Sequence, residues 1–242
     1  MTAALDDQAI YLVLSEALLS GRLDAGVKLG EQKLATLFGV TRERVRKVLH
    51  RLGHERLIEV LPNRGAYVVN PSLEDVREIY EARRIVEGGI AWRVAECLSS
   101  EQEALLHAHF AHEEHAHDLG NRAESIRLSG AFHVLLAEMT RNELVIHQLR
   151  ELVGRTAILV ALLEDDSTPR CGVDEHAAIL RALASREPAA AARAMTAHLS
   201  LIETRLQPRS AHRRKADLDA TLRAAIDAHV RRQPALEGDR AA

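Results

Sequence analysis

Three histidines lie among apolar residues in the second half of the sequence. They are His133, His176 and His198, and apolar residues such as Phe132 and Ile179 surround them. An imidazole on the inward face of a helix is costly unless it is hydrogen-bonded or ligated. For one such residue alone, a core histidine satisfied by a hydrogen bond is the simpler interpretation. Three on separate helices of one bundle would suit a site for Zn²⁺, Ni²⁺ or a similar ion.

A second group of histidines falls within residues 101–119, interleaved with Glu113 and Glu114. Its members are His107, His109, His112, His115 and His117. His112 and His115 have a spacing that could share an ion. Because the group is spread around one helix with glutamates between, we interpret it as a solvated face.

Arg83 and Glu87 are four residues apart, which places both on one face of a helix. The simpler interpretation is an intrahelical ion pair, worth about 0.2–0.5 kcal/mol. The alternative is an arginine that points into the bundle and receives a carboxylate through two hydrogen bonds. Spacing alone favours the ion pair.

Motifs of catalysis are missing from the sequence. It contains no Gly-rich phosphate loop, no GxSxG and no HExxH. Glu175 adjoins His176, but neighbouring helical residues point about 100° apart and do not easily share a site. We therefore expect no enzyme. A metal-dependent hydrolase is the weakest alternative, because no convincing general base accompanies the histidines.

A basic segment runs from Thr41 to Arg56 and carries six basic residues against two acidic ones. Arg42, Arg44 and Arg46 fall at the N-terminal end of an expected helix, the end that enters the major groove in helix-turn-helix proteins. A lone charge run is more often a solvated face. Here it occupies the second helix of a helix-turn-helix pattern, with Arg64 at the tip of a wing, which indicates DNA binding.

The elements that hold these basic residues have a definite order. The pattern gives a helix at 31–38, a second helix from residue 42, and β-prone runs at 58–61 and 66–69. Gly39 ends the first helix because glycine tolerates positive φ, and Thr41 can cap the second. Helix, tight turn, helix and hairpin together predict a winged helix-turn-helix.

The remainder of the chain shows almost only helical periodicity. Pro71 disfavours helix in the residue before it, and Ser72 can cap the helix that begins after it. Helices are expected at about 73–98, 101–119, 123–140, 143–163, 173–185 and 188–206. Six antiparallel helices of this length form a bundle. We therefore expect a mostly α protein with three parts, which are a winged helix-turn-helix at 1–70, an all-α antiparallel helical bundle at 71–207, and a basic linker with a C-terminal helix of unknown role at 208–242.

Composition agrees with this division. Aromatic residues make up 3% of the chain, so packing relies on Leu, Ile, Val and Ala. Residues 1–70 carry ten Lys/Arg and eight Asp/Glu, whereas the remainder carries 22 and 27, so DNA contact should be confined to the first part. Two cysteines form no disulfide framework. Without a signal peptide or an apolar stretch long enough to span a bilayer, we expect a cytoplasmic protein with no membrane contact.

Several segments resemble a known family. The first part is similar to the DNA-binding domain of GntR-family repressors over LGEQKLATLFGVTRERVRKVLHRLGHERLIEVLPNRGAYV. The second part resembles the FCD effector domain of the FadR-like branch in IYEARRIVEGGIAWRVA, AFHVLLAEMTRN and DEHAAILRALASREPAAAARAMTAHL. The resemblance covers about residues 8–206. It implies DNA contacts by the recognition helix and the wing, at Thr41, Arg42, Arg46, Arg64 and Gly65. We add Arg44 for its position and charge.

The resemblance also implies a site in the bundle. His133, His176 and His198 fall on the family's three metal-binding histidines, so the cofactor would be Zn²⁺ or Ni²⁺. Ser129 stands where the family has a fourth ligand, an Asp, and a hydroxyl is the poorer ligand. Arg83 falls on a position that in related proteins helps bind an effector's carboxylate. We therefore expect these five residues to form the effector site for a small organic acid.

Together these expectations describe a ligand-responsive transcriptional regulator, most often a repressor in this family. It would bind a pseudo-palindromic double-stranded DNA operator as a homodimer. The alternative is a metalloregulator, in which the metal ion is itself the signal.

Overall fold

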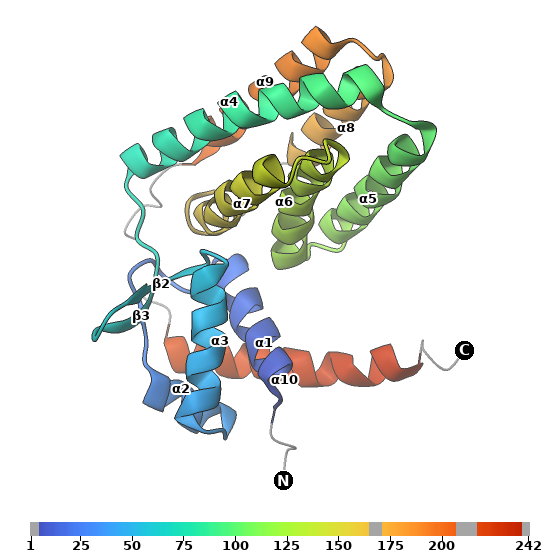
Figure 1. Cartoon of the computed structure of the whole chain (residues 1–242). Helices are drawn as coiled ribbons and strands as arrows, with labels where there is room; N and C mark the ends of the chain where they lie inside the picture. Colours follow the sequence, from blue (N-terminus) through green and yellow to red (C-terminus); the bar gives the residue numbers. More distant parts are fainter. Residues whose placement is uncertain (1–4, 165–170, 207–216, 239–242) are drawn as a thin grey trace. The chain divides into compact units, whose positions relative to one another are not determined.

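The computed structural model describes residues 5–164, 171–206 and 217–238, which form two compact units (Figure 1). The first unit contains the described residues up to Asn70 together with the C-terminal helix, and the second begins at Pro71. The fold is mostly α-helical, as expected. None of the helices in the described ranges is long and apolar enough to cross a membrane.

The first unit is a winged helix-turn-helix. Its N-terminal elements are α1 (Asp7–Leu19), β1 (Lys28–Leu29), α2 (Glu31–Phe38), α3 (Arg42–His54), β2 (Ile58–Leu61) and β3 (Gly65–Val68). The strands form an antiparallel sheet in the order β1-β3-β2, and β2 and β3 make the wing. The strand β1 was not expected, because two residues are too short to show an alternating pattern.

Three local features set the geometry of this unit. Gly39 ends α2 at φ 65°, and the Thr41 hydroxyl accepts a hydrogen bond from the backbone N–H of Arg44 to cap α3. The wing turns tightly through Asn63 at φ 58° and Gly65 at φ 97°. Both angles lie in the left-handed region, which glycine and asparagine adopt most readily.

The C-terminal helix α10 (Leu218–Gly238) belongs to this unit and packs against α1. The helix α1 buries residues on most of its circumference, so it needs more than one partner and also packs against α3. Leu222 and Ala225 of α10 are at most 1% exposed. Lys33 of α2 forms an ion pair with Asp219 at 3.1 Å. The sequence left the partner of this helix open, and the basic residues 212–215 lie outside the described residues.

The second unit is a helical bundle. Its helices are α4 (Leu73–Cys97), α5 (Ser100–Asp118), α6 (Arg122–Met139), α7 (Glu143–Leu163), α8 (Cys171–Ala184) and α9 (Pro188–Arg205). The long helix α4 packs along α9, and α6 packs against both α5 and α7 (Figure 1). Ser72 caps α4 as expected, and Asp75 completes a capping box by accepting from the Ser72 backbone N–H. Tyr80, Phe132 and other fully buried side chains fill the core.

Candidate histidine centre and nucleic-acid interface

Three imidazoles meet inside the bundle. His133 comes from α6, His176 from α8 and His198 from α9, and each is at most 2% exposed. Nε2 of His198 lies 3.2 Å from Nε2 of His176 and 3.3 Å from Nε2 of His133. Among the described residues, these three are the group whose possible donor atoms all lie within 4.8 Å of one another. Within the described residues, the histidines of α5 do not form a group of possible metal ligands.

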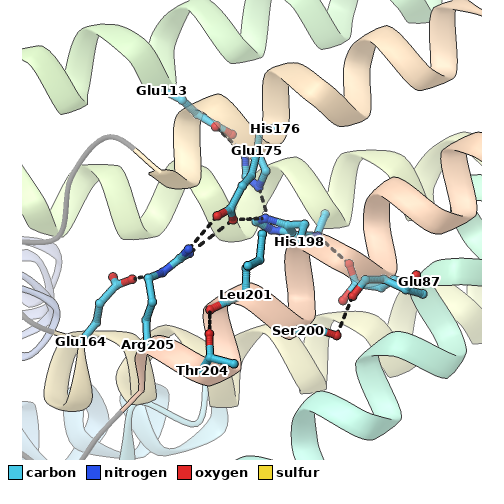
Figure 2. Close-up of polar contacts among 12 residues, drawn as sticks. Glu87, Glu113, Glu164, Glu175, His176, His198, Ser200, Leu201, Thr204 and Arg205 are labelled. Atoms are coloured by element: carbon cyan, nitrogen blue, oxygen red, sulfur yellow. Dashed lines mark hydrogen bonds and ion pairs between the residues drawn. The ribbon is translucent and has the colours of Figure 1, made fainter.

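A glutamate carboxylate lies next to Nδ1 of each of the three imidazoles. Nδ1 of His176 lies 2.7 Å from Glu113 Oε2, and Nδ1 of His198 lies 2.7 Å from Glu175 Oε2, as Figure 2 shows. A third carboxylate, Glu87 Oε2, lies 2.5 Å from Nδ1 of His133. The three carboxylates come from three different helices, α4, α5 and α8.

These carboxylates decide which nitrogen of each ring carries the proton. A carboxylate accepts hydrogen bonds, so Nδ1 of His176 and of His198 holds the N–H, and the close carboxylate of Glu87 favours the same tautomer in His133. In a neutral ring of this tautomer, Nε2 keeps a bare lone pair. Burial lowers the pKa of His133 to about 4 and that of His198 to about 3, so both rings are neutral at pH 7. Their Nε2 lone pairs point at one another, and a positive charge between them would relieve the repulsion.

The spacing of the nitrogens suits a metal ion. Two Zn–N bonds of roughly 2.0–2.1 Å at a tetrahedral angle place their nitrogens about 3.3 Å apart. The observed separations of 3.2 and 3.3 Å match this value. Ser129 lies one turn before His133 on α6 and is half-buried, but it is not part of the close group. The buried triad could therefore hold a metal ion with three protein ligands.

Charged residues hold the carboxylates in place. Burial alone would raise the pKa of Glu87, but the Arg83 guanidinium and His133 bring it to about 2. Nε of Arg83 lies 2.5 Å from Glu87, and its Nη1 donates to Thr156 at 3.0 Å. The expected ion pair of Arg83 and Glu87 thus forms, but it is buried rather than on the surface, with side chains 4% and 1% exposed.

A similar network stands behind His198. Arg205, in the last turn of α9, donates to Glu175 at 2.6 Å and to Glu164 at 3.0 Å (Figure 2). The site therefore connects α7, α8 and α9 through one guanidinium. Burial opposes ionisation of Glu175, yet hydrogen bonds from His198 and Arg205 lower its pKa.

Several buried polar atoms of this network make no hydrogen bond within the described residues. Nδ1 of His133 and Oε2 of Glu87 are 2.5 Å apart but not in hydrogen-bonding geometry. Nη2 of Arg83 and the hydroxyl of Tyr80, one turn apart on α4, also lack a partner. The guanidinium carbon of Arg83 lies 5.6 Å from the centre of the Tyr80 ring. Buried polar groups left without a partner are costly, so a polar ligand or water is expected there.

The basic face of α3 forms the second candidate site. Arg42 and Arg46 are exposed and lie one turn apart at the start of the helix, after the capping residue Thr41. Both arginines contact Glu31 of α2. The wing residues Arg64 and Gly65 are also exposed, at the turn between β2 and β3. The predicted DNA contacts therefore lie on one unit, on α3 and on the wing.

Comparison with protein families settles the family. Residues 7–68 match "Bacterial regulatory proteins, gntR family", and residues 78–201, slightly more than half of the chain, match the FCD domain. The chain is a GntR-family regulator with an FCD domain. GntR regulators bind DNA through the first of these domains, so the unit with the basic α3 is the DNA-binding unit.

Similar proteins are regulators of the same family. The HTH-type transcriptional repressor RspR of Escherichia coli K12 is 28% identical over 199 residues, which cover 81% of this chain and 86% of RspR. LutR of Bacillus subtilis 168, an HTH-type transcriptional regulator, is 29% identical over 211 residues, 76% of this chain and 93% of LutR. A putative GntR regulator from Rhodococcus sp. RHA1 shares the fold, with a TM-score of 0.66 and 21% identity over 82% of this chain and 95% of that one.

Arg44, one of the residues of this GntR regulator for which the sequence predicts a DNA contact, is engaged within its own unit. Arg44 turns toward the N-terminal segment, where Nε lies 2.6 Å from Asp7 and Nη2 donates to the carbonyl of Leu5 at 3.0 Å. Its side chain is 34% exposed, compared with 50% for Arg46. These contacts hold the N-terminal segment against α3.

Sequence reasoning missed two residues of the FCD site. Glu113 was assigned to a solvated face, yet it is 3% exposed and accepts from His176. Glu175 was set aside because it adjoins His176, yet its partner is His198 on the next helix. The sequence around each glutamate gave no signal for these contacts, because the partner histidine lies on a different helix.

Proposed function

We propose that this GntR-family protein is a ligand-responsive repressor that binds a pseudo-palindromic operator as a homodimer. In this proposal, a small organic acid binds in the FCD bundle beside a divalent metal ion and changes operator affinity. The observation that carries the proposal is the convergence of three Nε2 atoms inside the bundle, with a carboxylate next to Nδ1 of each ring. The similarity to the repressor RspR supports the direction of regulation.

The residues of the metal site would be His133, His176 and His198, with Glu87, Glu113 and Glu175 orienting them. Zn²⁺ or Ni²⁺ suits a set of three imidazole nitrogens. When bound, the ion would supply a positive charge able to accept an anionic oxygen from an effector. Because Ser129 stands in place of the family's Asp ligand, the ion would lack a carboxylate from the protein at that coordination position. This favours an effector whose own carboxylate can bind the ion.

The anchor for the effector would be on α4. Nη2 of Arg83 has no partner among the described residues, while Glu87 and Thr156 fix the rest of its guanidinium. A guanidinium held in this way is ready to bind a carboxylate. The Tyr80 hydroxyl could receive a second polar group of the same molecule. We infer a short organic acid with a carboxylate and at least one further oxygen.

DNA recognition would rest on the first unit. Arg42, Arg46 and the capping residue Thr41 would face the major groove, and Arg64 with Gly65 would enter the neighbouring minor groove. Two copies of α3 would read half-sites one helical turn apart. Because effector and operator are linked through one protein, operator binding must weaken the effector by the same factor as the effector weakens the operator.

The deciding experiment measures the metal content of the purified protein by plasma mass spectrometry. We expect about one ion per chain, its loss in His133→Ala, and its retention in His147→Ala, which changes an exposed histidine of the same bundle. Metal-free wild-type protein in metal-supplemented buffer would contradict the metal site. Arg83 and Tyr80 would then be the effector anchors by themselves.

A second experiment tests the DNA side. Arg42→Ala should weaken operator binding while the circular dichroism of the bundle stays unchanged. Wild-type affinity in Arg42→Ala would refute the assignment of α3. The alternative function, a metalloregulator, would be favoured if metal alone changed operator affinity in the absence of any organic acid.

A further inference from the structure

A single carboxylate lies between the arginines of the recognition helix. Nε and Nη2 of Arg46 donate to the two oxygens of Glu31 at 2.8 and 2.7 Å, a bidentate pair. Nη2 of Arg42 reaches the same carboxylate at 3.4 Å, a longer single contact. Glu31 is the first residue of α2, and its side chain is 25% exposed. The turn at Gly39 brings this helix end beside the start of α3.

The two contacts leave the arginines in different states. A guanidinium has five N–H groups along two edges, one formed by Nε and Nη2 and the other by Nη1 and Nη2. Glu31 occupies the Nε/Nη2 edge of Arg46, so the Nη1/Nη2 edge remains available. The single long contact leaves Arg42 much freer to move.

The available edge of Arg46 has the shape needed for a base. Guanine presents O6 and N7 in the major groove, and a bidentate arginine is its commonest specific partner. A side chain that is already oriented loses less rotational freedom when it binds. At the same time, the negative charge of Glu31 opposes the phosphates, so it lowers attraction to DNA of any sequence.

We propose that Glu31 is a specificity-determining residue, which holds Arg46 by one edge so that the other edge reads a guanine. Glu31 is a positioning residue that acts through Arg46. Arg42, held loosely, contacts phosphate. The inference rests on the proposed role of α3 in operator binding. The carboxylate thus exchanges general DNA affinity for discrimination at one base pair of each half-site.

The test uses the full-length protein and synthetic duplexes. A selection from random duplexes first defines the wild-type operator, and then each G·C pair of a half-site is replaced in turn. We expect wild type to lose about 10- to 100-fold in affinity at one such pair, as a bidentate contact would give. Arg46→Ala should abolish the preference at that pair, which identifies it.

Glu31→Gln should reduce the discrimination at the same pair to less than about threefold while affinity for an unrelated duplex stays equal or rises. The double variant Glu31→Gln with Arg46→Ala should behave like Arg46→Ala alone at this base pair, because Glu31 acts only through Arg46. Glu43→Gln is the matched control, because it removes the same charge from the first turn of α3, where Glu43 acts on Arg46 only through its charge and not through a hydrogen bond that orients the guanidinium. It should raise non-specific affinity similarly and keep the discrimination.

Two results would overturn the proposal. One is full discrimination in Glu31→Gln, and the other is an equal loss on every duplex, which a folding defect would also produce. Thermal unfolding of each variant separates that defect from a loss of specificity. If wild type selects no sequence at all, the proposed operator binding fails as well, whereas selection by wild type without a Glu31 effect refutes the role of Glu31 alone.

Discussion

Glu175 and His198 are hydrogen-bonded across two helices, with Oε2 of the carboxylate 2.7 Å from Nδ1 of the ring. Glu175 therefore serves not the histidine beside it in sequence but one 23 residues away. The same carboxylate accepts a hydrogen bond from Arg205. The imidazole, the carboxylate and the guanidinium therefore form a continuous hydrogen-bond network from the centre of the bundle to the end of α9. His198 is thereby fixed in orientation before any ion or effector arrives.

This chain makes metal affinity sensitive to residues that are not ligands. Glu175→Gln keeps a hydrogen-bond acceptor but removes the charge that favours a basic Nε2. We expect metal affinity to fall about 10- to 100-fold, as is usual when a residue that orients a metal ligand is changed. Competition with a chromophoric chelator measures the affinity. Glu138→Gln, which affects an exposed pair with Arg150, is the control and should leave it unchanged. Equal affinity in Glu175→Gln would contradict the role of Glu175.

Acid should destabilise the metal-free bundle. Burial lowers the pKa of His133 to about 4 and of His198 to about 3, below the unfolded value of about 6.5. Between these values the unfolded chain binds more protons than the folded one, so stability is full above about pH 6.5 and falls as pH drops through the window. Each histidine adds a slope of up to about 1.4 kcal/mol per pH unit.

Urea unfolding of metal-free protein between pH 7 and 5 measures that slope. His198→Gln should flatten it, because an amide does not titrate in this range. The buried carboxylates Glu87 and Glu113, each with a pKa of about 2, extend the loss to lower pH in the same direction. A slope of wild-type steepness in His198→Gln would exclude His198 as a source.

The sequence predicted the helices well because their signals are local. Ser72 and Thr41 are capping residues before periodic apolar runs, and both cap the helices they precede. The expected triad of His133, His176 and His198 also comes together, because each histidine lies on an otherwise apolar helix face. Periodicity therefore suffices to identify elements and the residues that must point inward.

Sequence reasoning could not supply the pairings between helices. Glu113, Glu175 and Glu31 each contact a residue on a different helix, and their neighbours in sequence suggested solvent or nothing. An acidic residue is expected to be exposed unless its cationic partner is known. The rotation of one helix against another decides the partner, and this rotation depends on packing over the whole unit. The same reason concealed the partner of α10.

Two glycines of the bundle should respond oppositely to alanine. A Cβ at Gly89 of α4 would meet nothing within 4 Å, whereas one at Gly130 of α6 would lie 2.9 Å from Val153 Cγ1. Gly89→Ala should therefore stabilise the bundle by about 0.5–1 kcal/mol through helix propensity. Gly130→Ala should destabilise it, because overpacking of about 1–3 kcal/mol exceeds that gain. Urea unfolding measures both, and the same sign for the two would contradict the packing of α6 against α7.

The C-terminal helix should be necessary for the stability of the DNA-binding unit. Leu222 is fully buried on α10, which packs against α1, so Leu222→Ala should cost that unit about 2–5 kcal/mol. Val230 of the same helix is 41% exposed, and Val230→Ala should have little effect. The two units can unfold separately, so the transition of the DNA-binding unit is followed by hydrogen exchange at amides of α1 and α3, with α4 and α9 as the internal reference. Faster exchange in α1 and α3 but not in α4 and α9 is expected for Leu222→Ala. Unchanged exchange in all four helices would mean that α10 does not support this unit in solution.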